Sequence, residues 1–482
     1  MNNMSNNTQQ NKVDNKSRRS LYISLFCFLS IFFFGMLILR GVPLYNDSKQ
    51  YMDMHVHREP VYPLFLWITR MIAGEHSLIF AGILQCALAV YASFRFITYV
   101  LDNVCLKYIV VKKMSLIKWI IVLALTLTVI TPYIITPLMS ATHVMLATGI
   151  LSEALAVPLF LLFVVSLHKL LVDRTDEGAV IIRHIAFSFI ISLLLSLTRS
   201  QMIVTLIAWS IAAMVSAITA TGNMKSKAYK LVIIMLIFIV SLPLRTTVTK
   251  TYNFIFNGRY VDNVYSNVTM LSNIFYVTDR ESGELIEDED LRTIFYRLYD
   301  VMDENEWSYK YAGDTATDRA IYLEDMHDMI KFDVIEAGFR DIMNERGMPE
   351  YIDYNLKAEE YSGRLIKILW PRCFGKWLAD WFIMGCRGVV RSIAVIHPVM
   401  FIYSLLAMVY LVFAMAVSFK REANLAAYAF IALLLLMGNA FGTSFTIMCL
   451  SRYMIYGFIL FYSAIIVLFA RMIYNRHDEK QK

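Results

Sequence analysis

Long runs of apolar residues, separated by short polar connections, dominate the pattern of this chain. A helix that crosses a membrane needs about 20 mostly apolar residues. The pattern predicts about ten such helices, of which the fifth is short. They cover residues 20–39, 78–101, 119–138, 147–167, 185–199, 201–221, 231–248, 393–418, 424–446 and 453–470. The expected fold class is therefore all-α, in a polytopic membrane protein.

Two segments depart from this pattern and are long enough to form structure outside the membrane. Residues 40–77 hold a charged and aromatic loop. Its apolar stretch Val61–Ala73 is too short to span and predicts a helix at the membrane surface. Residues 249–392 are polar, and amphipathic periodicity in Asp290–Asn305 and Asp318–Arg346 predicts a mainly helical soluble domain there.

These boundaries divide the chain into a cytoplasmic tail (1–19), a transmembrane core with its outer loop (20–248), an extracytoplasmic acidic domain (249–392), C-terminal transmembrane helices (393–470) and a second cytoplasmic tail (471–482). The orientation follows from the short connections, because loops rich in Lys and Arg stay on the cytoplasmic side. Every second connection is basic, which predicts that both termini are cytoplasmic. The loop and the acidic domain then face outward.

The distribution of charge agrees with this orientation. The net charge of the chain is only +6 at pH 7. Residues 249–392 hold 17 Lys and Arg against 26 Asp and Glu, a net charge of −9, so the remainder carries +15. We therefore expect a protein of the cell membrane with an acidic outer side.

Composition excludes several other classes of protein. Hydrophobic residues make up 58% of the chain and charged residues 17%, whereas soluble proteins contain about 25% charged residues. This balance excludes a disordered chain and a disulfide-rich secreted one. The spacing of Cys373 and Cys386 does not demand a disulfide. Glycine motifs for nucleotides are absent, and the basic inner loops are no sign of nucleic-acid binding.

The first outer loop concentrates charged and aromatic side chains directly after a membrane span. Asp47 and Tyr51 precede the run Arg58-Glu59-Pro60-Val61-Tyr62-Pro63-Leu64, which enters the apolar stretch. This order of an Asp, a Tyr and an Arg/Glu-Pro-x-Tyr-Pro-Leu run resembles the GT-C family of membrane glycosyltransferases. The protein O-mannosyltransferases and aminoarabinose transferases belong to that family.

Three further motifs extend the resemblance over residues 20–250 and, more weakly, over the last spans. Leu151-Ser152-Glu153 is similar to the family's Ser/Thr-Glu stretch at the outer start of a middle span. Leu197-Thr198-Arg199 is similar to its break between two helices, and Arg452-Tyr453 to its Arg-Tyr pair before a late span. The chain departs from the family after Asp47, where Ser48 stands in place of a second acid.

The resemblance implies a function. Such enzymes move a sugar from a polyprenyl-phosphate carrier to an acceptor on the outer side of the membrane, here a cell-envelope glycan, a lipid or a protein. The donor is already activated, so the site needs a base for the acceptor hydroxyl and cations for the departing phosphate. Direct displacement by one base would invert the anomeric centre.

We expect the site to combine acids, arginines and tyrosines. Asp47 would be the catalytic base, and Glu153 would complete the pocket. Substrate binding is assigned to Arg58, Glu59, Tyr62, Arg199, Arg245 and Arg452, with Asp53 and Tyr51 as secondary candidates. Arg58 and Arg199 would hold the carrier phosphate. No cofactor is implied with certainty; a divalent metal stays an open alternative with unknown ligands.

The main candidates also have plainer interpretations. Asp47 lies in a segment with good turn chemistry. Arg58 and Arg199 could anchor the chain at the membrane interface. Glu153 could face a helix N-terminus.

The histidines of the first loop suggest a metal site less strongly. His55 and His57 alternate with Asp53 in a metal-like spacing. Residues two positions apart do not share a helix face. This spacing favours a solvated loop.

Three other functions stay open. A polysaccharide polymerase or ligase of the same membrane class would use a polyprenyl diphosphate-linked glycan and bring in Arg245 and Arg452. A transporter or lipid flippase would carry charged groups at the membrane midplane, whereas the candidates here lie toward one surface. An assembly scaffold would bind through residues 249–392. Membrane lipids are partners in every case.

Overall fold

The computed structural model describes residues 2–105, 115–140, 142–172, 178–220, 223–394, 397–419 and 422–479. Helices account for nearly all of these residues, which contain no β-strand. The all-α fold class expected from the sequence is therefore confirmed for this part of the chain.

Nine of the described helical segments are long and apolar enough to cross a membrane. They belong to α1 (Asn2–Arg40), α4 (Ser77–Tyr99), α5 (Ser115–Met139), α6 (Glu153–Val172), α8 (Ile203–Thr219), α9 (Met224–Asn257), α15 (Pro398–Phe419), α16 (Ala423–Ser444) and α17 (Ser451–Glu479). The fifth of the expected spans corresponds to α7 (Gly178–Ser196), whose apolar part Ile182–Ser196 is shorter. The count among described residues is thus nine, in keeping with a multi-pass membrane protein.

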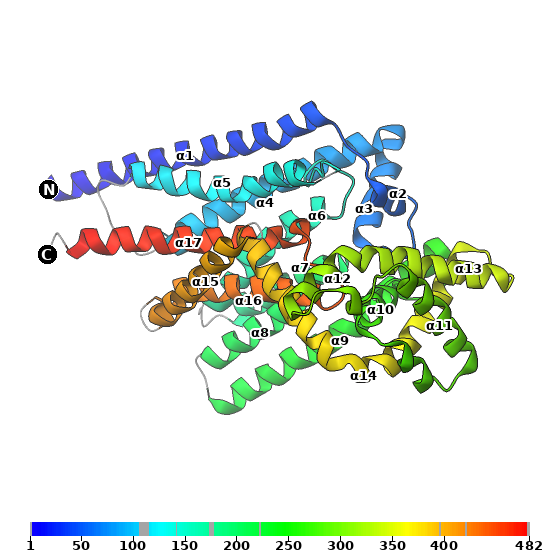
Figure 1. The fold of residues 1–482 in the computed structure, drawn as a ribbon. Helices are drawn as coiled ribbons and strands as arrows, with labels where there is room; N and C mark the ends of the chain where they lie inside the picture. The colour runs from blue at the N-terminus through cyan, green and yellow to red at the C-terminus, as the bar shows by residue number, and fades with distance from the viewer. Residues whose placement is uncertain are drawn as a thin grey trace.

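The apolar helices form one bundle around a shared core (Figure 1). α6 lies inside it, where Phe160, Phe163 and Leu167 are buried. Both ends of the chain lie at one end of the bundle, and α2 (Asn46–Met52) lies at the other (Figure 1). The first loop is therefore remote from the two termini.

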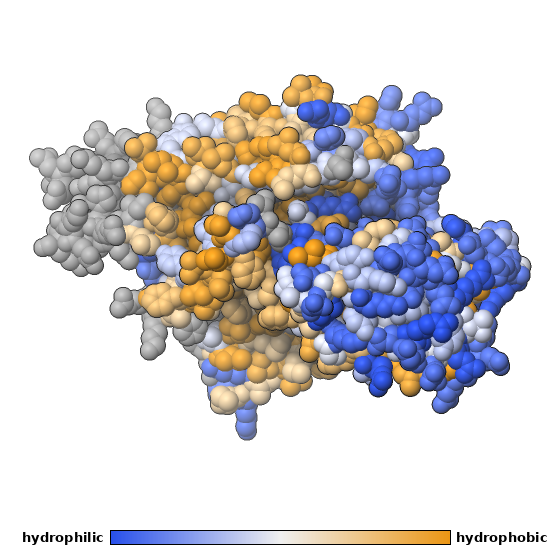
Figure 2. Space-filling view, viewed as in Figure 1, coloured by the Kyte–Doolittle hydropathy of each residue, from blue (hydrophilic) through white to orange (hydrophobic). Residues whose placement is uncertain are grey.

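A second group of helices packs around its own core at that far end (Figure 1). It consists of α10 (Ser266–Val277), α11 (Glu289–Glu304), α12 (Ala316–Met329), α13 (Ala337–Glu345) and the first part of α14 (Tyr351–Ile393), and is called the α10–α14 region below. Phe275, Phe295 and Phe339 are fully buried in it. Its surface is mainly hydrophilic, whereas the bundle surface is mainly hydrophobic (Figure 2).

The amphipathic helices expected at Asp290–Asn305 and Asp318–Arg346 are confirmed. The first is α11, which starts where the Asp288 carboxylate accepts from the Leu291 amide at 3.0 Å. The second is the run from α12 to α13, joined by the π-helical turn Ile330–Glu336. The membrane helix expected from residue 393 begins later, at Pro398, because α14 continues through that position.

The segment before α6 also differs from expectation. A helix was expected from residue 147, but residues 147–152 form turns and α6 starts at Glu153. These turns pair with the first loop: the Ile150 amide donates to the Pro43 carbonyl at 3.1 Å, and the Ile150 carbonyl accepts from the Ser48 hydroxyl at 2.8 Å. The pairing fixes the first loop against the start of α6.

The first loop itself contains α2 and α3 (Val61–Ala73). α3 covers the residues of the short apolar helix expected from the sequence. It ends at Gly74, whose φ of +54° favours glycine. α2 begins where the Tyr45 amide donates to the Ser48 hydroxyl at 2.8 Å. This start places Asp47 in the first turn of α2, within reach of Arg58.

Candidate functional site

Asp47 and Arg58 form an ion pair across the first loop. Their charged atoms lie 2.7 Å apart. Arg58 also donates to the Gln50 side chain at 2.8 Å and lies 4.7 Å from the centre of the Tyr51 ring. These contacts hold the guanidinium beside the carboxylate.

The electrostatic environment keeps Asp47 ionised. Burial alone would raise its pKa, but the positive charges of Arg58, Arg452 and Arg199 outweigh burial and lower the pKa below its usual value. Three arginines from different parts of the chain therefore act on one carboxylate. The sequence had assigned all four residues to one site.

Glu153 and Arg199 form a second pair, which is more deeply buried. Their charged atoms lie 2.6 Å apart, and the side chains are 3% and 12% exposed. Arg199 follows the end of α7 in an extended conformation, φ −150° and ψ 134°, so the break expected between two helices is present. Its guanidinium also donates to the Ser152 hydroxyl and to the Gln201 side chain, each at 3.2 Å.

A third pair joins Glu59 to Arg245. The carboxylate accepts from the Arg245 guanidinium and, at 2.8 Å, from the Ser200 hydroxyl. Arg245 donates in turn to the Ser196 carbonyl at 3.3 Å. The pair therefore links the first loop to α9 and to the end of α7. We call these three pairs, Asp47–Arg58, Glu153–Arg199 and Glu59–Arg245, the three-pair cluster.

Arg452 adds a cation that has no such partner. No described carboxylate lies within ion-pairing distance of its guanidinium, which donates to the Tyr453 hydroxyl at 2.8 Å. Its Nε atom is buried and has no hydrogen-bond partner among the described residues. Arg452 and Arg199 lie 4.9 and 5.2 Å from the centre of the same Tyr453 ring. Together with the three pairs, the site therefore holds one more arginine than carboxylate.

The tyrosines lie behind the charged groups. Tyr51 is buried and donates to the Ser152 hydroxyl at 3.1 Å, which links the first loop to the second pair. Its ring meets Tyr62 edge to face at 4.9 Å. Tyr62 is fully buried and accepts from the Gln85 amide at 2.7 Å. The structure thus gives Tyr62 a supporting position one layer away from the charges.

Asp53 is not brought into the cluster. It ends α2 through its backbone amide, which donates to the Lys49 carbonyl at 2.9 Å, and its side chain is exposed. Within the described residues, no three His, Cys, Asp or Glu side chains gather in a way that could hold a metal ion. All six cysteines, including Cys373 and Cys386, are free.

The histidines of the first loop are less solvated than their spacing predicts. His57 is buried and stacks on Tyr265 with ring centres 4.7 Å apart. His55 is half-buried and meets the edge of Tyr351 at 4.7 Å. Both tyrosines belong to the α10–α14 region or its approach, so aromatic packing has replaced water around His57.

Lys331 is a component of the site that sequence reasoning missed. It lies in the π-helical turn, is 6% exposed, and its ammonium is 4.4 Å from the centre of the Tyr265 ring. Burial lowers its pKa to about 8, although the charges of Asp328 and Glu336 oppose this; Arg58 and Asp47 also act on it, in opposite directions. One signal was available in the sequence. Positions four residues apart form one stripe of a helix, and here this stripe consists of Leu323, His327, Lys331 and Ile335. A Lys thus occupies a largely apolar stripe.

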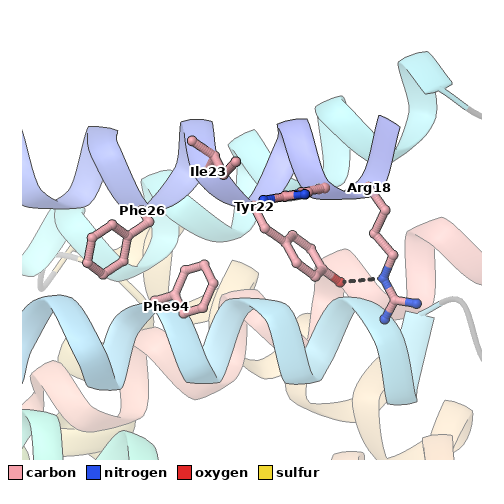
Figure 3. A pocket seen from close by; sticks show the side chains of 6 residues that line it. Arg18, Tyr22, Ile23, Phe26 and Phe94 are labelled. Atoms are coloured by element: carbon pink, nitrogen blue, oxygen red, sulfur yellow. Dashed lines mark hydrogen bonds between the residues drawn. The ribbon is translucent and has the colours of Figure 1, made fainter. Parts of the chain in front are cut away.

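A separate groove lies on the bundle, away from the three-pair cluster. It has a volume of about 500 Å³ between α1 and α4 (Figure 3). Its walls are Tyr22, Ile23, Phe26 and Phe94, with Arg18 and Arg19 at one end. Asp102 already accepts from Arg18 at 2.5 Å and from the Tyr22 hydroxyl at 2.6 Å. Arg18 is therefore paired with a carboxylate, unlike Arg452.

No protein-family model, curated protein or solved structure matches this chain. The function is therefore argued from the arrangement of the side chains.

Proposed function

We propose that the protein is a membrane glycosyltransferase that moves a sugar from a polyprenyl-phosphate carrier to an acceptor hydroxyl on the outer side of the membrane. The observation that carries the proposal is the arrangement around Asp47. The carboxylate is ionised, pairs with Arg58, and lies in the field of Arg199 and of the unpaired Arg452. A base and cations for a phosphate are thus supplied by one site.

The same proposal includes an orientation. Both termini would be cytoplasmic, and the α10–α14 region would form the outer soluble domain, with α7 as a tenth span. The position of the termini at the end of the bundle opposite α2 supports this orientation (Figure 1). The Lys and Arg bias of the connections supports it independently. The active site would then face outward, between the first loop and the α10–α14 region.

The reaction would proceed as one displacement. The acceptor hydroxyl gives its proton to an Asp47 carboxylate oxygen while its oxygen forms a bond to C1 of the sugar. The bond between C1 and the phosphate oxygen breaks, and its electron pair leaves on the phosphate. Arg452 and Arg199 stabilise the charge that develops there. Inversion at C1 follows from the single displacement.

Arg58 explains how a carboxylate with a low pKa can act as a base. A base works best when its pKa is near the working pH. In this structure the charge of Arg58 lowers the pKa of Asp47. If Arg58 turns toward the donor phosphate, Asp47 loses its nearest cation and becomes more basic. Donor binding would then activate the base.

The direct test is transfer by the purified full chain in lipid vesicles. The donor is the polyprenyl-linked sugar that accumulates in cells lacking the protein. We expect Asp47→Asn to lower the rate by about 100-fold or more, the usual contribution of a general base. Asp290→Asn is the matched control, because Asp290 pairs with Arg346 at 2.5 Å on the surface of α11. Unchanged transfer by Asp47→Asn would show that Asp47 is not the base.

Arg452→Ala tests the phosphate site in the same assay. A hydrogen bond to a charged group contributes about 1.5–3 kcal/mol, so donor binding should weaken by roughly 10- to 100-fold. A loss confined to KM would mean that Arg452 binds the donor, and a loss in kcat would mean that it stabilises the departing phosphate. If Arg452→Ala kept the wild-type KM and kcat, Arg452 would have no part in donor binding or transfer.

The arginine pair beside Tyr453 also favours one alternative. Two cations on one ring could hold the two phosphates of a diphosphate-linked glycan. The protein would then be a polysaccharide polymerase or ligase. Supplying the same sugar on a monophosphate and on a diphosphate carrier separates the two functions. Lipid movement across vesicles without transfer would instead favour a flippase.

A further inference from the structure

A buried carboxylate outside the three-pair cluster has no partner in the part of the chain that the structure describes. Asp380 lies on α14 and is 2% exposed. Neither carboxylate oxygen has a hydrogen-bond partner among the described residues. Glu153 and Glu59 are buried to a similar extent, but each is paired with an arginine. An unpaired buried carboxylate costs several kcal/mol, so this position calls for a missing partner.

The space beside Asp380 limits the size of that partner. A small cavity there is lined by Asn273 of α10, Leu323 of α12, Trp377 and Trp381 of α14, and Ser444 and Met448 at the end of α16. Its free volume is about 10 Å³, which is room for one water-sized particle. A sugar or an acyl chain does not fit. The partner is a single small species.

The polar groups of the cavity define the chemistry of that species. The Asn273 side-chain oxygen has no hydrogen-bond partner among the described residues. The Ser444 hydroxyl donates to the Phe441 carbonyl at 3.1 Å, which leaves its lone pairs free. The Trp381 indole N–H donates to the same carbonyl at 2.9 Å and is not available. The cavity thus offers acceptor oxygens from Asp380, Asn273 and Ser444.

Nearby charges do not neutralise Asp380. Burial raises its pKa to about 6, and the positive charge of Arg319 opposes this only in part. Tyr276 is the other ionisable group on which Asp380 acts, and its hydroxyl donates to the Arg319 carbonyl at 2.7 Å. Above pH 7 the carboxylate is therefore mainly ionised and uncompensated.

We propose that this cavity binds one small monovalent cation, of the size of sodium or potassium, through Asp380, Asn273 and Ser444. One negative charge matches one positive charge, whereas a divalent ion would leave a buried charge of +1. The site is independent of the proposed transfer reaction.

The position of the site gives the cation a structural role. Asn273, Leu323 and Asp380 lie on α10, α12 and α14, whereas Ser444 ends α16 and Met448 lies between α16 and α17. That connection leads directly to Arg452 at the start of α17. The cation would hold the α10–α14 region against the segment that carries Arg452.

The experiment is thermal unfolding of the purified full chain in detergent at pH 8. NaCl or KCl replaces choline chloride at constant ionic strength, so that only the cation changes. We expect a saturable rise of the midpoint on the order of 2 °C. Asp380→Asn should abolish this rise. Asn273→Ala should raise the cation concentration at which half of the rise is reached. Asp353→Asn, an exposed carboxylate on the same helix, should respond like the wild type.

Two results would overturn the proposal. The first is an equal cation response in the wild type and in Asp380→Asn, which would place the binding elsewhere. The second is no cation response in the wild type, together with an Asp380→Asn variant at least as stable. Asp380 would then be a protonated carboxylic acid. If Asp380→Asn does not fold, the titration shift in Asn273→Ala decides.

Discussion

Two groups of arginine–carboxylate pairs in this protein share a geometry and differ in burial. In the three-pair cluster, Glu153 and Arg199 lie 2.6 Å apart and are 3% and 12% exposed. On the α10–α14 region, Arg297 and Glu345 form two hydrogen bonds of 2.7 Å but are 44% and 62% exposed. The distance between charges therefore does not separate a candidate site from a solvated surface. Burial separates Glu153–Arg199 and Glu59–Arg245 from the surface pairs, whereas Asp47–Arg58, 33% and 21% exposed, is intermediate.

The physical reason is desolvation. Water already solvates both members of an exposed pair, so the pair contributes about 0–1 kcal/mol. A buried pair has lost that water, and the attraction between its members mainly repays the loss. Such a pair adds little stability, yet it holds charges in a fixed arrangement that a charged reactant can use without further reorganisation.

The largest effect on stability is expected from breaking the buried pair on one side. Arg199→Ala leaves the Glu153 carboxylate buried without its cation, which costs about 3–5 kcal/mol. A double variant with Glu153→Gln and Arg199→Met removes both charges and should recover most of the loss. The measurement is unfolding of the purified chain in detergent micelles. If the single and double variants were equally unstable, the unpaired charge of Glu153 would not be the cause of the lost stability.

Lys331 is a third case, a buried cation that contacts aromatic rings and forms no ion pair with a described carboxylate. Its pKa is about 8, below the ordinary value of 10.5. The native state thus binds fewer protons than the unfolded state between these values, so this group makes stability rise with pH there. The cost of its charge is fully present below about pH 8.

Lys331→Met should remove this contribution. The variant's stability should rise less steeply than that of the wild type between pH 8 and 10, by roughly 3 kcal/mol at most over the full titration. Lys357→Met is the control, since Lys357 is 40% exposed beside Glu360. Unfolding midpoints at pH 7, 8, 9 and 10 provide the measurement. Parallel curves for Lys331→Met and the wild type would mean that Lys331 does not titrate in this range.

The two groups of pairs also show what sequence can predict. Asp47, Arg58, Glu153 and Arg199 stand beside apolar runs, where an ionisable residue attracts notice, and the structure brings them together. The limits of α3 follow from apolar periodicity in the same way. The local sequence singled out each of these residues, whereas their grouping into one site came from the resemblance to a known family.

Other features depend on contacts between distant segments. His57 is buried because Tyr265, more than 200 positions later, stacks on it. Asp380 is buried because α10, α12 and the end of α16 close around it. Residues 147–152 give up a helical conformation because they pair with the first loop. Local periodicity contains no information about these partners.

The smallest effect is expected at the exposed pair, and it decides how the comparison is understood. Arg297→Ala removes two hydrogen bonds of good length, yet both side chains are open to water. We expect a loss of about 1 kcal/mol or less, weaker still at high salt, because ions screen an exposed pair. Unfolding in low and high NaCl measures it beside Arg199→Ala. A loss as large as that of Arg199→Ala would mean that the geometry of a pair, and not its burial, sets the free-energy cost of breaking it. Burial would then no longer support the three-pair cluster as a site, and only its arginines would.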